Sequence, residues 1–228
     1  MSIYFVTGTD TDVGKTIVTA ALAAVAVRRG RTVAVVKPAQ TGVSGGEDGD
    51  LAVVRRLAGK VRTYDGARLP HPLAPDRAAL VSGQSLPTLA EQRDLVLTSS
   101  ADSDVTLVEG AGGVTVNLGD GFGLLGLASA LTESGCRVDW IVVARAGLGT
   151  LNHTKLTVDA ITRAGFSVQG VVIGSWPNSP GLAELHNRDD LSRYSGVPLL
   201  GSVPEGSGRL EPEAFSRQAP DWIPYASL

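Results

Sequence analysis

Short apolar runs alternate along the chain with longer segments of helical character. The short runs are rich in Val and Ile and fall at residues 3–6, 32–36, 105–108, 140–144 and 168–174. The longer segments, which have a helical pattern, fall at residues 15–29, 50–57, 89–99, 122–134, 150–164 and 182–194. Because the short runs lack apolar/polar alternation, they predict strands buried on both faces. We therefore expect an α/β fold with a mostly parallel sheet flanked by helices on both faces.

Two stretches do not fit this alternation. Residues 60–76, KVRTYDGARLPHPLAPD, contain several prolines, and we expect them to form a loop over the sheet. The C-terminal stretch EPEAFSRQAPDWIPYASL is expected to be neither a basic patch nor an amphipathic helix. No internal repeat, low-complexity tract or linker is evident, so we expect one domain over residues 1–228.

Composition narrows the class of protein. Of 228 residues, 43% are hydrophobic and 19% charged, which supports a full core and argues against wholesale disorder. A net charge of -3 gives no general attraction for nucleic acid or an anionic membrane, so we expect neither as a partner. The chain begins without a basic signal region, and its longest apolar run, residues 20–27, is too short to span a bilayer. We expect a cytoplasmic protein.

Metal-ligand patterns built from cysteine and histidine are missing. Cys136 is the only cysteine, which excludes an internal disulfide and a multi-cysteine zinc cluster. His71, His153 and His186 are scattered and have no metal-ligand spacing, so we do not expect zinc.

The stretch VTGTDTDVGKTIV, residues 6–18, resembles a phosphate-binding loop. Gly14, Lys15 and Thr16 form the usual ending, although Gly8 lies one residue too far upstream for the G-x-x-x-x-G-K-[ST] spacing. A predicted strand precedes this stretch and a predicted helix follows it, so backbone N–H groups and the helix dipole can bind an anion. Lys15 would reach the terminal phosphates and Thr16 would bind Mg²⁺. We interpret the stretch as a P-loop variant.

Asp10 and Asp12 are unusual inside such a loop, because carboxylates repel phosphate. We expect both to point away from the phosphates or toward a cation or amine, and Asp10 to be simply solvated.

Carboxylates follow two of the predicted strands. Glu109 comes directly after VTLV and precedes GAGG, the position of a magnesium ligand beside a P-loop. Asp50 could supply a second carboxylate from the glycine-rich segment after the second strand, with Asp48 and Glu47 as alternatives. Solvated loop carboxylates remain an alternative for the whole group.

Two further positions suggest binding chemistry. Lys37 ends the second predicted strand, where it either points into the crevice as a cation or extends to solvent from the sheet edge. Thr41 follows four residues later and places a hydroxyl nearby.

A second such position lies in RAGLGTLNH, residues 145–153. Thr150 is a candidate N-cap there, and the helix N-terminus could bind a carboxylate. An ordinary connection between strand and helix is the alternative.

Four stretches together resemble one family. VTGTDTDVGKT, KPAQTG, VEGAGG and GTLNHTKLT, in this order and spacing, are similar to the ATP-dependent dethiobiotin synthase (dethiobiotin synthetase) family over about residues 1–176. The resemblance implies a single-domain P-loop NTPase-like fold, a homodimer and a ligase of biotin biosynthesis. It implies Mg²⁺ as cofactor, ATP as co-substrate, and 7,8-diaminononanoate and CO₂ as the other substrates.

The resemblance also assigns roles. Lys37, Lys15 and Thr11 are implied as catalytic, and Thr16, Asp50 and Glu109 as the metal ligands. Nucleotide or metal contacts are implied at Asp12, Val13, Gly14, Lys15, Thr16, Ile17, Asp50, Glu109, Gly110, Ala111, Gly112, Gly174, Ser175, Val203, Pro204 and Glu205. Substrate contacts are implied at Thr41 and, across the dimer, at Leu148, Gly149, Thr150, Leu151 and Asn152.

The sequence departs from the family pattern in two places. The family's Asn-Asp pair after the strand near residue 173, whose Asn reads adenine, is replaced by Gly174 and Ser175. Because glycine offers no side-chain amide, we expect weaker selection for adenine, with CTP or another nucleoside triphosphate as an alternative to ATP. The region after SVPEG matches only loosely.

Three other functions remain as alternatives. A related P-loop amidoligase would need a glutaminase domain with a nucleophilic cysteine, and Cys136 lacks that context. A partitioning-type ATPase would need a basic patch or an amphipathic terminal helix. A nucleotide-binding regulator would bind the nucleotide without turnover.

Overall fold

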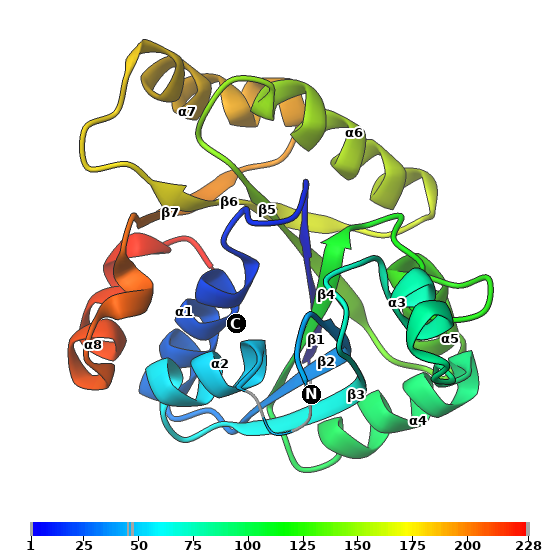
Figure 1. The fold of residues 1–228 in the computed structure, drawn as a ribbon. Coiled ribbons are helices and arrows are strands. Elements are labelled where there is room, and N and C mark those ends of the chain that lie inside the picture. Colours follow the sequence, from blue (N-terminus) through cyan, green and yellow to red (C-terminus); the bar gives the residue numbers. More distant parts are fainter. Residues whose placement is uncertain (1, 45, 47, 227–228) are drawn as a thin grey trace.

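The computed structural model describes residues 2–44, 46 and 48–226. Within these residues, one sheet has the strand order β3-β2-β4-β1-β5-β6-β7, and every neighbouring pair is parallel (Figure 1). The strands are β1 (Ser2–Gly8), β2 (Val33–Thr41), β3 (Arg62–Leu69), β4 (Val105–Gly113), β5 (Val138–Ala144), β6 (Val168–Trp176) and β7 (Leu199–Pro204). The predicted parallel α/β fold is therefore confirmed.

Helices cover both faces of the sheet. They are α1 (Lys15–Arg28), α2 (Asp50–Ala58), α3 (Pro75–Ser82), α4 (Leu89–Ser100), α5 (Leu124–Glu133), α6 (Thr150–Arg163), α7 (Leu182–Ser195) and α8 (Pro212–Trp222), with a short 3₁₀ helix at Ser207–Arg209. Core residues of α1, α2 and α8 pack on one face, and core residues of α4, α5 and α6 pack on the other (Figure 1). Helix α7 packs against α6.

Strand β1 shows why the strands lack alternation. Tyr4 and Val6 pack into the core beneath α1, whereas Ile3 and Phe5 pack into the core on the opposite face. All four are nearly or fully buried, because successive side chains point to opposite faces and both faces are covered. This central strand leads directly into the P-loop.

The prediction of a loop over residues 60–76 is wrong. Residues 62–69 form β3, and α3 begins at Pro75. In the described part of the chain β3 pairs only with β2, so it is an edge strand whose side chains are mostly half-buried or exposed. Its sequence, RTYDGARL, is therefore too polar to show the apolar run that marks a buried strand.

The prediction for the C-terminal stretch is also wrong. Residues 212–222 form α8, an amphipathic helix whose Phe215, Ala219 and Trp222 are buried. These side chains belong to the same core as α1 and α2, and Arg29 donates a hydrogen bond to the Ala226 carbonyl at 3.1 Å. The apolar side of α8 is thus used in packing. A terminal amphipathic helix exists after all, so its expected absence no longer argues against a partitioning-type ATPase.

Across residues 2–44, 46 and 48–226, every helix is too short or too polar to cross a bilayer.

Candidate nucleotide and metal site

The loop between β1 and α1 is closely packed. Gly14 is the N-cap of α1 and has φ 91°, a left-handed conformation that glycine adopts without steric cost. A Cβ on Gly14 would lie 2.5 Å from the carbonyl oxygen of Gly174, and a Cβ on Gly8 would lie 2.6 Å from that of Asp10. No side chain caps the start of α1 within the described residues, which leaves its first N–H groups for a ligand. The strand, loop and helix therefore follow the order predicted for a P-loop.

Lys15 lies folded back on this loop. Its ammonium donates a hydrogen bond to the Asp10 carbonyl at 2.9 Å, and the residue is buried. Burial lowers the pKa of Lys15, and the nearby Lys37 lowers this pKa further, against the opposing effect of Glu109. A second positive charge so close makes this a strong site for an anion.

Asp10 is not simply solvated, so that expectation is wrong. Its carboxylate accepts a hydrogen bond from the Thr11 N–H at 2.8 Å and forms an ion pair with Arg145 at 2.5 Å. The hydrogen bond from the Thr11 backbone is the main cause that lowers the pKa of Asp10, with Arg145 contributing. Arg145, which the sequence reasoning did not select, thereby links the P-loop to the segment after β5.

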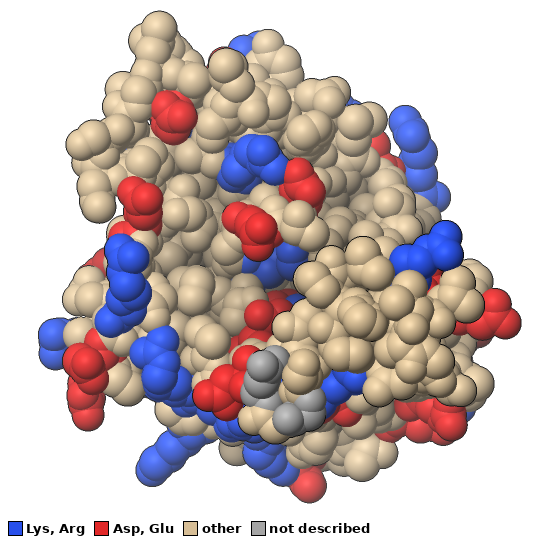
Figure 2. Space-filling view, viewed as in Figure 1, with Lys and Arg blue, Asp and Glu red and all other residues tan. Residues whose placement is uncertain are grey.

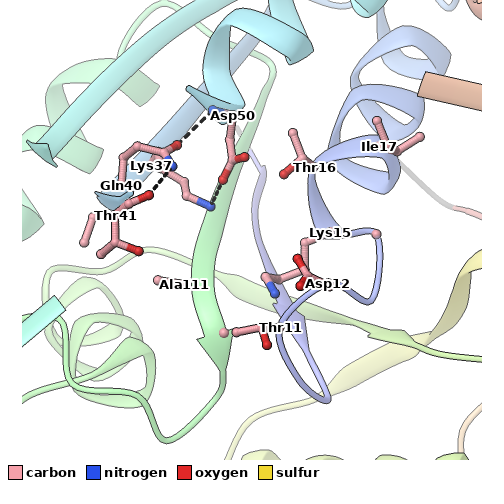
Figure 3. Close-up of a pocket in the computed structure, with 13 residues that line it drawn as sticks. Thr11, Asp12, Lys15, Thr16, Ile17, Lys37, Gln40, Thr41, Asp50 and Ala111 are labelled. Atoms are coloured by element: carbon pink, nitrogen blue, oxygen red, sulfur yellow. Dashed lines mark hydrogen bonds and ion pairs between the residues drawn. The ribbon is translucent and has the colours of Figure 1, made fainter. Parts of the chain in front are cut away.

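Lys37 is the centre of the site. Its Nζ lies 2.6 Å from Asp50 Oδ2 (Figure 3). It also lies 2.8 Å from Glu109 Oε1 and donates to the Gly110 carbonyl at 3.1 Å. Burial by itself lowers the pKa of Lys37, but Glu109 and Asp50 outweigh burial, so the pKa is raised and the side chain stays an ammonium. Only 3% of the residue is exposed, which excludes the alternative of a lysine extending to solvent.

Lys37 also lies earlier in its strand than predicted. Strand β2 continues to Thr41, so Lys37 is within the strand and does not end it. Pairing of β2 with β4 stops at Val36, whose partner is Val108. Beyond this point the two strands separate, and Lys37 meets Glu109, the residue after Val108.

Glu109 is fully buried at the same place. Its Oε1 accepts hydrogen bonds from the Thr16 hydroxyl at 3.0 Å and from Lys37. Its Oε2 has no hydrogen-bond partner in the part of the chain that the structure describes. A buried carboxylate oxygen without a partner is costly, and a bound cation would satisfy it.

These residues fit Mg²⁺. The carboxylates of Asp50 and Glu109 and the Thr16 hydroxyl are hard oxygen ligands, and Mg²⁺ is commonly held by one or two carboxylates together with phosphate oxygens. No group of three or more His, Cys, Asp or Glu side chains suited to a metal occurs among the described residues, so the site depends on this smaller set. Asp48 is exposed and does not line the cavity, and Glu47 lies outside the described residues.

A cavity of about 440 Å³ joins the P-loop to this cluster. Its lining consists of Thr11, Asp12, Gly14, Lys15, Thr16, Ile17, Lys37, Ala39, Gln40, Thr41, Asp50, Ala111 and Gly112. A second cavity of about 440 Å³ shares part of this wall and adds residues 72–75 and Val116. In the space-filling view, acidic and basic side chains both lie inside the central hollow (Figure 2).

Other predicted positions lie away from this cavity. Ser175 and Glu205 are exposed, and the Glu205 N–H donates to the Trp176 carbonyl at 2.7 Å, so the ends of β6 and β7 are adjacent. The substrate segment 148–152 does not line either of these two cavities, and Leu148 is 82% exposed. Thr150 is not the N-cap of α6. It is the first helical residue, after Gly149 at φ 87°.

Gln40 is a site residue that sequence reasoning missed. It is 7% exposed, lines the cavity and accepts a hydrogen bond from the Asp50 N–H at 2.8 Å. The only available signal was its place in KPAQTG, between Lys37 and Thr41.

The sheet order, the P-loop and the neighbouring cluster of Lys37, Asp50 and Glu109 define a P-loop nucleotide-binding protein. Solved structures of similar fold include the septum site-determining protein MinD complexed with Mg-ADP from Pyrococcus horikoshii (TM-score 0.60, 17% identity, 96% of this chain and 95% of that chain). A ParA family ATPase from Chlorobium tepidum has a TM-score of 0.60 at 12% identity, covering 98% of this chain and 94% of that one. At these identities the likeness shows the fold.

Sequence relatives give the family. Residues 3–212 match the AAA domain family. The ATP-dependent dethiobiotin synthetase BioD of Rhodococcus jostii is 54% identical over 98% of this chain and 95% of its own length. The protein of the same name from Streptomyces avermitilis is 48% identical over 98% of this chain and 92% of its length. This chain belongs to the ATP-dependent dethiobiotin synthetase family, so the predicted family and enzyme class, a ligase, are confirmed.

Proposed function

We propose that this chain uses a nucleoside triphosphate and Mg²⁺ to convert 7,8-diaminononanoate and CO₂ into dethiobiotin, releasing the diphosphate and phosphate, in biotin biosynthesis. The observation that carries the proposal is the buried contact of Lys37 with Asp50 and Glu109. Glu109 in turn accepts a hydrogen bond from the P-loop residue Thr16. The proposal is supported by a second ammonium and an oxygen-rich set of side chains beside a phosphate-binding loop, in a chain of this family.

The chemistry explains the need for two ammonium groups. One amine of the substrate adds to CO₂ and loses a proton, which gives a carbamate. A carbamate oxygen then attacks the γ-phosphorus, and the nucleoside diphosphate leaves. The second amine attacks the carbamate carbon of this mixed anhydride, the ring closes, and phosphate leaves. Negative charge accumulates on phosphoryl and carbamate oxygens, where fixed positive charges lower the barrier most.

The residues divide this work between them. The P-loop backbone and Lys15 bind the phosphates, and Lys37 neutralises charge between the carbamate and the γ-phosphoryl group. Thr16, Asp50 and Glu109 would hold Mg²⁺, which supplies charge neutralisation on the phosphate oxygens when bound. Thr11 lines both cavities, which supports a role for it where nucleotide and diamine would meet.

The second cavity suits the rest of the diamine. Thr41 belongs to its wall, and Leu73 and Val116 give that wall an apolar surface for a methylene chain. The segment 148–152 lies outside this cavity in one protomer, so we propose that a second copy supplies it to the substrate carboxylate in a homodimer. Leu148, two residues before the start of α6, is exposed in one chain and would be covered in such a dimer.

The direct test is formation of the product. Purified protein mixed with diaminononanoate, bicarbonate, Mg²⁺ and ATP or CTP is expected to yield the cyclic urea, detected by mass spectrometry. Reactions that lack the diamine or the nucleotide serve as controls and are expected to give none. Tight nucleotide binding without any ureido product would contradict the proposal and favour a nucleotide-binding regulator.

The base preference is expected to be weak. A Cβ on Gly174 would lie 2.0 Å from the Val13 carbonyl oxygen, so a side chain at this position must displace the P-loop. A side-chain amide that reads adenine is therefore sterically excluded at residue 174. Without its paired hydrogen bonds, discrimination between nucleotides by the shape of the base alone is worth about a hundredfold or less. In competition at equal ATP and CTP, we expect comparable use of the two nucleotides. A strong preference for ATP would contradict this inference.

A further inference from the structure

The start of helix α2 is capped from another element. Helix α2 begins at Asp50, and its N-cap Gly49 has no side chain with which to cap. Instead the Gln40 side chain on β2 accepts a hydrogen bond from the Asp50 N–H at 2.8 Å, while its Nε2 donates to the Thr41 carbonyl at 3.1 Å (Figure 3). An N–H requires an acceptor and a carbonyl requires a donor, so only one orientation of the amide satisfies both contacts.

Gly49 leaves room for this contact. A Cβ on Gly49 would lie 2.9 Å from Gln40 Oε1, closer than real Cβ contacts allow. Gln40 is itself 7% exposed, so water does not readily replace it as the acceptor. The fit of Gln40, Gly49 and Asp50 is therefore close, and the contact joins the end of a glycine-rich segment to the sheet.

Strand β2 thus holds Asp50 in two different ways. Lys37 holds its carboxylate by charge at 2.6 Å, and Gln40 holds its backbone by a neutral hydrogen bond. If the function proposed above is correct, the Lys37 ammonium must move from the carboxylates toward the reacting phosphoryl group when the metal binds. The contact made by charge is then lost, while the contact to the backbone can persist.

We propose that Gln40 is a positioning residue for the metal site. It fixes the backbone of Asp50 so that the carboxylate remains directed at the metal after Lys37 has left it. This inference rests on the proposed role of Asp50 as a metal ligand. Residues that orient a ligand commonly change metal affinity by about tenfold or more when replaced.

Metal binding tests the proposal. Mn²⁺ is titrated into the chain of residues 1–228 with a non-hydrolysable nucleotide, and free Mn²⁺ is followed by electron paramagnetic resonance. Gln40→Met keeps the length of the side chain but removes its acceptor, and it is expected to raise the Mn²⁺ Kd by about tenfold. Because Gln40 acts through Asp50, the double variant Gln40→Met/Asp50→Ala is expected to match Asp50→Ala alone.

Gln92→Met is the matched control. Gln92 is also buried and donates to the Pro38 carbonyl on the same strand at 2.8 Å, a hydrogen bond that does not involve Asp50. Its replacement is expected to leave the Mn²⁺ Kd unchanged. An equal loss in both glutamine variants would mean that β2 packing in general supports the metal, and would overturn the proposal.

Amide hydrogen exchange of Asp50 separates this inference from the proposed function. In protein free of metal and nucleotide, the Asp50 N–H is expected to be protected in the wild type and to exchange faster in Gln40→Met. Unchanged exchange, or wild-type Mn²⁺ affinity in Gln40→Met, overturns the role of Gln40. Wild-type affinity in Asp50→Ala would instead show that the metal assignment itself is wrong, and the inference would be overturned together with it.

Discussion

Lys37→Leu is expected to lower kcat by about a thousandfold while nucleotide affinity changes far less. The Lys37 ammonium is not part of the P-loop, and its contacts are with Asp50, Glu109 and the Gly110 carbonyl. Its charge is therefore needed mainly as negative charge develops on the transferred phosphoryl group and the carbamate, and much less for binding the nucleotide. Single-turnover kinetics together with nucleotide titration measure the two effects separately.

The same substitution is expected to strengthen metal binding although it weakens catalysis. Without the ammonium between them, Asp50 and Glu109 lose their counter-charge, so Mn²⁺ in the absence of nucleotide is expected to bind more tightly than in the wild type. Lys60→Leu, at an exposed position, is the matched control and is expected to change neither kcat nor the affinity for Mn²⁺. Near-normal turnover in Lys37→Leu would defeat the assignment of Lys37.

The parts of the site that the sequence predicts are those encoded locally. The P-loop can be recognised because strand, glycine turn, Lys15 and helix follow each other without interruption. Glu109 can be recognised because a carboxylate directly follows the apolar run VTLV, although β4 continues through it to Gly113. The buried strands are visible because burial on both faces leaves continuous runs of Val and Ile.

What the sequence does not predict depends on which elements become neighbours. Strand β3 was missed because an edge strand needs no apolar run. Helix α8 was missed because Pro220 lies inside it, although its buried Phe215, Ala219 and Trp222 have the spacing of one helix face. The ion pair of Asp10 with Arg145 joins residues 135 positions apart. Gln40 was missed for a similar reason. Its side chain accepts a hydrogen bond from the first residue of α2, which follows it in the sequence after a glycine-rich segment.

Among the predicted substrate and base contacts, only those close to the P-loop can be located within a single chain. Thr11 is part of the P-loop, and both Thr11 and Thr41 line the cavity beside it. The segment 148–152 is not part of that cavity, so its role needs a second copy of the chain and stays a prediction. The organisation of the chain as one domain, and the contacts of Val203, Pro204 and Glu205 with a base, also stay predictions.

Glu109→Gln is expected to lower kcat by about a hundred- to a thousandfold and to raise the Mg²⁺ concentration required for half-maximal rate. Metal-assisted charge stabilisation is worth several kcal/mol, and each 1.36 kcal/mol corresponds to about tenfold in rate. The substitution keeps the size of the side chain but removes the charge of the carboxylate whose Oε2 lacks a partner among the described residues. Steady-state rates measured over a range of Mg²⁺ concentrations give both quantities.

The fold is expected to tolerate this change, because Lys37 keeps its contact with Asp50 at 2.6 Å. Thermal unfolding is therefore expected to shift much less than activity. Glu133→Gln, at an exposed position on α5, is the matched control and is expected to behave as the wild type. If Glu109→Gln kept wild-type turnover and Mg²⁺ requirement while Asp50→Ala lost both, the metal would be bound by Asp50 without Glu109. The buried carboxylate would then serve only to hold Lys37 and Thr16 in place.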